Sequence, residues 1–163
     1  MSEFSIGQVA RASGMNEATF RGYLHRGYWR IMTHKGDAKS QSEGMQANIS
    51  MASALGFAVA AEFVRRGAKP SDAFHVAMGW FAHSAMGQRR PAELFDQTKY
   101  GDTYLALLTS PDGTPTGRIF AAVCDDPLSE VFGPRGSQSP YAAILLRLNP
   151  IVEHAARQLA GGM

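Results

Sequence analysis

The feature that most constrains the fold is a pair of short amphipathic segments near the N-terminus, separated by four residues. Ser5 is followed three residues later by Gln8, which is the capping-box spacing at the start of a helix. Apolar residues then recur at helical intervals, at Ile6, Val9 and Ala10. Because Gly14 is a natural helix terminator, we predict a helix over residues 6–12.

The second segment carries its own start and stop signals. Asn16 can cap a helix over residues 17–25, with Phe20 and Leu24 on its buried side and Gly27 ending it. Two short helices joined by the turn Ser13–Asn16 form a helix-turn-helix pattern.

The chain changes character after Gly27. Residues 28–33 and 45–49 favour extended structure, and the segment between them is polar and carries lysines. This pattern predicts a β-hairpin with a long tip, which is the shape of a wing.

Two further helices are predicted next. The first covers residues 50–66 and ends at Gly67; the second covers residues 69–86, with Pro70 in its first turn, where a missing N–H costs nothing. Residues 87–101 are broken by glycine and proline, so they predict a polar linker with one helical turn near residues 92–95.

The C-terminal part predicts strands rather than helices. Strand-like runs occupy residues 103–109, 118–123 and 141–148, and Asn149 and Pro150 can begin a final helix. A module of this size is too small for a comfortable core of its own, so it should pack on the N-terminal part or on a second copy. The strand at 141–148 suits a subunit contact or a buried core position equally well.

The predicted fold class is therefore α+β. Residues 1–86 form four helices plus a β-hairpin wing, residues 87–101 form the linker, and residues 102–163 form a β-β-β-α module for dimerisation or sensing.

Basic residues are concentrated at the N-terminal end. The chain of 163 residues has a net charge of +2, and residues 1–50 carry six basic and four acidic side chains. The remainder is balanced. A local positive excess suits a surface that faces phosphates, although a solvated face is the alternative.

Residues 4–27, FSIGQVARASGMNEATFRGYLHRG, resemble the DNA-binding start of the MerR family of regulators. The family pattern is an aromatic residue, then I-G-x-V/L-A, a glycine turn and T-L-R-x-Y-x-x-x-G. The matching residues are Ile6, Gly7, Val9, Ala10, Gly14, Thr19, Phe20, Arg21, Tyr23 and Gly27. The second helix pair of the family has a counterpart in residues 49–77, so the resemblance covers about residues 4–85 and implies a winged helix-turn-helix. Residues 87–101 predict no long dimerising helix of the kind that the family carries.

This resemblance and the helical geometry give the candidate DNA-binding residues. Side chains near the start of the second helix reach base edges, and we assign Glu17, Ala18 and Gly22 to groove approach, with Asn16 at the same end. Backbone contacts are assigned to Thr19, Arg21, Tyr23 and Arg26, and the resemblance supports Arg21 and Tyr23 as phosphate contacts. In the wing, Arg30, Lys35 and Lys39 would lie over the adjacent minor groove or backbone.

Other interpretations remain open for two of these side chains, and two histidines leave the same question open. Tyr23 can be a core aromatic residue, and Arg21 can pair with Glu17 one turn before it. His25 and His34 can be solvated or can touch DNA.

The remaining chemistry is sparse. Cys124 is the only cysteine, which excludes an internal disulfide and a cysteine-based zinc site. No apolar run approaches the roughly 20 residues that span a bilayer, and the N-terminus lacks a signal pattern. We expect a cytoplasmic, nucleoid-associated protein without enzymatic activity, cofactor, metal or membrane contact.

The expected function is sequence-specific binding of double-stranded DNA by a homodimeric regulator, most simply a repressor. An effector is not identified by the sequence. The alternatives are a phage-type excisionase or DNA-architectural accessory factor, and a protein–protein adaptor that has lost DNA binding.

Overall fold

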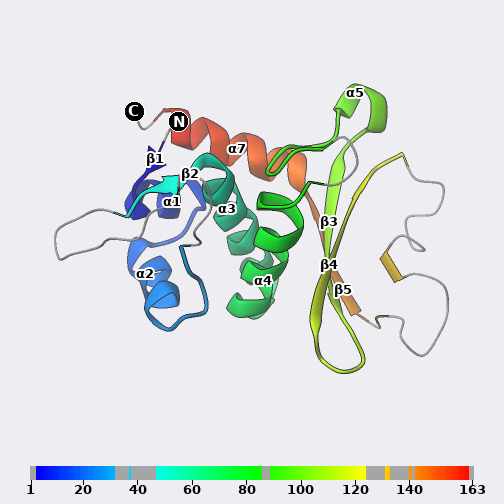
Figure 1. The fold of residues 1–163 in the computed structure, drawn as a ribbon, viewed down its shortest axis with the longest axis horizontal. Helices are drawn as coiled ribbons and strands as arrows, with labels where there is room; N and C mark the ends of the chain where they lie inside the picture. The colour runs from blue at the N-terminus through cyan, green and yellow to red at the C-terminus, as the bar shows by residue number, and fades with distance from the viewer. Residues whose placement is uncertain are drawn as a thin grey trace.

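The computed structural model describes residues 3–31, 37, 47–85, 89–123, 131–132, 140 and 142–161. These residues form a mixed α+β fold in which helices and two small antiparallel sheets are combined (Figure 1). The N-terminal helices lie at one end of the molecule and the larger sheet lies at the other, with helices between them (Figure 1).

The first two helices have the predicted bounds. Helix α1 spans Ile6–Ala12 and α2 spans Glu17–His25. The capping box at the start of α1 is complete: the Gln8 amide donates to Ser5 Oγ at 3.3 Å, and the Ser5 amide donates to Gln8 Oε1 at 2.9 Å. At the start of α2 the Ala18 amide donates to Asn16 Oδ1 at 2.8 Å.

The turn between α1 and α2 is built on Gly14. This glycine has φ of +63°, a conformation that L side chains rarely adopt. Its amide donates to the Arg11 carbonyl and the Met15 amide donates to the Ala10 carbonyl, both at 2.9 Å. This pair of bonds is a Schellman motif, so it satisfies carbonyls that the end of α1 would otherwise leave without partners.

The predicted strand over residues 28–33 is not found in its described part, residues 28–31. The Trp29 amide donates to the Tyr23 carbonyl at 3.1 Å, and the Trp29 indole donates to the Pro70 carbonyl at 2.9 Å. These bonds fold the chain back against α2 and against Pro70 instead of extending it. Most of the predicted wing, residues 32–36 and 38–46, lies outside the described residues.

A short sheet forms instead between two segments far apart in the sequence. Strand β1, Glu3–Phe4, pairs antiparallel with β2, Ile49–Ser50. Phe4 and Ile49 are opposite each other, and both are buried, so this pair ties the N-terminus to the start of the next helix.

Helix α3, Met51–Arg65, is the central helix and is buried along most of its length. Helix α4, Pro70–Val76, follows and continues as the π-helix η1, Ala77–Ala82. The prediction of one regular helix over residues 69–86 is therefore corrected: the α-helix ends at Val76, and a π-helix follows up to Ala82. At Gly56 of α3 a Cβ would lie 2.7 Å from the sulfur of Met78, so glycine allows α3 and η1 to pack closely.

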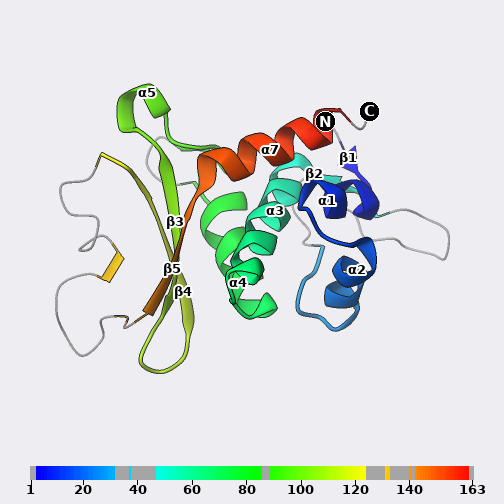
Figure 2. The same cartoon turned by 180° about the vertical axis from the view of Figure 1, so that it is seen from behind.

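The C-terminal part has the predicted order of three strands and a helix. The strands are β3, Thr103–Thr109, β4, Pro115–Ala121, and β5, Ala142–Arg147, arranged antiparallel in the order β4-β3-β5. Helix α7, Leu148–Ala160, then crosses over α3 and reaches α1 (Figure 2). One hydrophobic core therefore contains residues from both halves of the chain, and the proposed domain boundaries stay a prediction.

The predicted linker is packed where it is described. Arg89 is 3% exposed, and its guanidinium donates to five backbone carbonyls at 2.9–3.2 Å. Burial lowers the pKa of Arg89, while the nearby Glu93 acts in the opposite direction. The helical turn predicted at residues 92–95 is found later, as α5, Gln97–Tyr100, because Asp96 caps it through the Thr98 amide.

Candidate nucleic-acid interface

Helix α2 is held to the molecule by one side and exposes the other. Phe20 is fully buried, and its ring centroid lies 5.2 Å from that of Trp29 and 4.9 Å from that of Phe57. The opposite side of the helix is exposed, at Glu17, Ala18, Thr19, Arg21 and His25. Figures 1 and 2 place this helix at the end of the molecule farthest from the three-stranded sheet.

Arg21 pairs with Glu17, which is one of the two alternatives that the sequence left open. Its Nη2 lies 2.7 Å from Glu17 Oε1, and the two side chains are 59% and 49% exposed. An exposed pair one helical turn apart contributes only a few tenths of a kcal/mol. If Arg21 left its ion pair with Glu17 to contact a phosphate, the free energy lost with that pair would therefore be small.

The first two helices come close to each other at Gly7 and Glu17. A Cβ at Gly7 of α1 would lie 2.9 Å from Glu17 Oε2, so glycine at this position leaves room for the carboxylate.

Tyr23 lies on the aromatic side of α2. It is half-buried, and its ring centroid is 5.1 Å from that of Trp29 and 6.2 Å from that of Tyr28. Tyr23 and Arg21 therefore do not share one face, as their spacing of two residues predicts. Of the other residues assigned to this helix, Arg26 is exposed at its C-cap and Gly22 is half-buried.

The remaining predicted contacts are only partly described. Asn16 is exposed, and its side-chain oxygen is occupied by the helix cap. Arg30 is exposed just beyond α2. Lys35, Lys39 and His34 lie outside the described residues, as does most of the predicted wing.

One residue within the wing segment has an anchoring role that the sequence did not reveal. The Asp37 carboxylate accepts hydrogen bonds from the Ser50 amide at 2.7 Å and from Ser53 Oγ at 2.6 Å. Asp37 is therefore bonded to the first turn of α3. Asp37 is 13 residues from Ser50, and no local spacing rule connects them.

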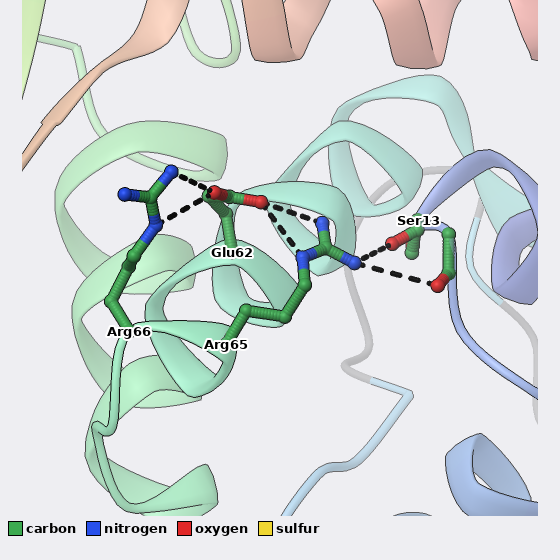
Figure 3. A network of polar contacts seen from close by, with 5 residues as sticks. Ser13, Glu62, Arg65 and Arg66 are labelled. Carbon is green, nitrogen blue, oxygen red and sulfur yellow. Dashed lines mark hydrogen bonds and ion pairs between the residues drawn. The ribbon is translucent and has the colours of Figure 1, made fainter.

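A second anchor fixes the turn between α1 and α2 (Figure 3). Arg65 Nη1 donates to the Ser13 carbonyl at 2.9 Å, and Glu62 holds the same guanidinium at 2.7 Å while also pairing with Arg66 at 2.8 Å. Burial alone would raise the pKa of Glu62, but hydrogen bonds from Arg66 and Arg65 outweigh it and lower this pKa. The spacing of Glu62, Arg65 and Arg66 indicates an ion-pair cluster, but the contact with Ser13 depends on the tertiary fold.

No helix in the described part of the chain is long and apolar enough to cross a membrane. Within the same residues, no group of three or more His, Cys, Asp or Glu side chains could hold a metal ion.

Comparison with models of known protein families and with curated proteins found no match.

Proposed function

We propose that this protein is a sequence-specific DNA-binding transcriptional regulator with a MerR-like winged helix-turn-helix, acting as a homodimeric repressor. The observation that carries the proposal is the exposed outer side of α2, on a helix whose start, turn and buried side are each held by specific contacts. A recognition helix needs this combination, because base contacts require a fixed register while the contacting side chains stay accessible.

The exposed side chains divide into two roles. Ala18 and Glu17, in the first turn of α2, approach base edges, with Gly22 one turn further along. Arg21, Thr19 and Arg26 are exposed and suited to phosphates. Tyr23 can contact DNA only through the exposed part of its side chain.

A homodimer fits the C-terminal sheet. In the described part of the chain, β5 has β3 on one side and no strand on the other. The opposite edge strand, β4, begins with a proline, which discourages pairing, whereas β5 exposes Leu145 at 47%. Antiparallel pairing of β5 with its copy would create a twofold axis and match a palindromic site.

The proposal is tested by selecting bound fragments from random duplexes and then measuring affinity for the selected site. Arg21→Ala should weaken binding to selected and random duplexes by a similar factor of about 10, because a phosphate contact carries no sequence information. Glu17→Gln should instead change the preference among sequences, and the specific complex should contain two chains per site.

Arg157→Ala is the matched control, because Arg157 is exposed on α7. Selection of no sequence, or equal affinity of the wild type and Arg21→Ala for every duplex, would contradict the proposal.

A further inference from the structure

A cavity of about 360 Å³ lies between the segment that follows α2 and the helices α4 and η1. Its volume is within the range of small-molecule sites. Six of its lining residues bear on the argument: Arg30, Phe74, His75, Met78, Gly79 and His83.

The lining combines an apolar floor with a basic rim. Phe74 and Met78 are buried, at 5% and 2% exposure, and they give the floor an aromatic ring and a thioether. Arg30 contributes a permanent positive charge, and His75 contributes an imidazole that can donate a hydrogen bond. None of the described side chains that line the cavity is acidic.

Gly79 leaves one wall of the cavity without a side chain. Gly79 lies in the π-helix η1, and a Cβ built there would meet no atom within 4 Å. Single π-turns inside helices are frequent at functional sites. A Cβ at position 79 would therefore enter open space, and a longer side chain there is expected to reduce the volume of the cavity.

His83 connects the cavity to the wing segment. Its Nε2 lies 2.9 Å from Ser53 Oγ, and that hydroxyl donates to Asp37 at 2.6 Å. Because the serine hydroxyl has a single hydrogen, Nε2 is the donor in its contact with Ser53. The chain of contacts orients the imidazole and ties the cavity wall to Asp37.

We propose that this cavity binds a small organic carboxylate with a flat apolar body. The carboxylate pairs with Arg30 and His75, while the body rests on Phe74 and Met78. The apolar floor favours such a ligand over a bare phosphate, which would leave it unfilled.

A consequence for regulation rests on the proposed function. Arg30 is also a candidate DNA contact, so ligand and DNA phosphate compete for its guanidinium. Occupancy of the cavity then lowers DNA affinity, and DNA lowers ligand affinity by the same factor.

In the test, the full chain is titrated with benzoate, and binding is monitored by two-dimensional amide NMR spectra. A Kd on the order of 1 mM is expected for a ligand of this size, with shifts concentrated at residues lining the cavity. Benzamide has the same shape without the charge and should bind more weakly.

Two variants distinguish the contribution of the Arg30 charge to binding from that of the free space beside Gly79. Arg30→Gln should raise the Kd for benzoate about 10-fold or more and leave that for benzamide nearly unchanged, because only the charge-assisted bonds are lost. Gly79→Leu should abolish binding of both compounds. Gly161→Leu is its matched control, since Gly161 is exposed, has negative φ and lies at the end of α7.

The possible outcomes separate this inference from the proposed function. Absence of a saturable shift up to about 20 mM benzoate, or unchanged binding in Gly79→Leu, would overturn the site. Saturable binding that Gly79→Leu removes supports the site even if no duplex is bound, in which case the regulator proposal fails by itself. If DNA is bound and benzoate does not weaken it, the competition at Arg30 is refuted.

Discussion

The two ends of this molecule are built by different physical means. At the N-terminal end, α1 and α2 are defined by contacts within a few residues, such as the Ser5–Gln8 capping box and the Gly14 turn. At the other end, β3 joins β4 and β5 through pairings between residues up to 43 positions apart, such as Tyr104 and Arg147. Local signals thus set the shape of the proposed DNA-binding end, while long-range packing sets its position on α3.

The shared core predicts that the two ends unfold together. Phe20→Ala should lower the free energy of unfolding by about 3–5 kcal/mol, because it removes a fully buried ring that contacts Trp29 and Phe57. Urea unfolding monitored by tryptophan fluorescence and by far-UV circular dichroism measures this loss.

The two signals should give coincident transitions for this variant and for the wild type. A separate early transition in fluorescence that circular dichroism does not show would mean that the two ends do not unfold together.

A smaller loss is expected where the sheet meets η1. A Cβ at Gly117 of β4 would lie 2.5 Å from the indole of Trp80, so Gly117→Ala should cost about 1–3 kcal/mol through overpacking. Gly79→Ala is the matched control, because a Cβ there meets nothing. Equal thermal midpoints for the two variants would show that the sheet is not packed tightly on η1.

The smallest effect concerns pH and the anchor of the helix-turn-helix turn. Because its pKa is lowered in the fold, Glu62 contributes stability above its unfolded value of 4.5, and this contribution is lost as pH falls below that value. Glu62→Gln should therefore cost about 0.5–1 kcal/mol at pH 7 and little at pH 3.

Urea titrations at the two pH values measure the difference between wild type and variant. A difference that is the same at both values would show that the Glu62 carboxylate does not sense its arginine partners.

Much of the N-terminal end could be predicted from sequence because caps and glycine turns act over three or four residues. The bounds of α1 and α2 follow from Ser5, Gly14 and Asn16, and the β-β-β-α order follows from strand composition. The mixed α+β class was also correctly predicted.

Other features depend on contacts that sequence spacing does not encode. The β1–β2 pair contains two residues in each strand and joins segments more than 40 residues apart. The burial of Arg89 depends on carbonyls from five separate residues, and the contact of Arg65 with Ser13 depends on how α3 packs beside the turn. The ion pair between Arg21 and Glu17 was foreseen as one of two alternatives, but composition could not choose between them.

The most direct test of the central claim, that α2 presents its exposed side to duplex DNA, is the salt dependence of affinity for a random duplex. Contacts to about four to six phosphates predict a loss of about 100- to 2,000-fold between roughly 50 and 200 mM salt. Arg21→Ala should reduce the slope of log K against log salt by about one. No measurable binding at the lower salt concentration, or an affinity independent of salt and of Arg21, would contradict the account.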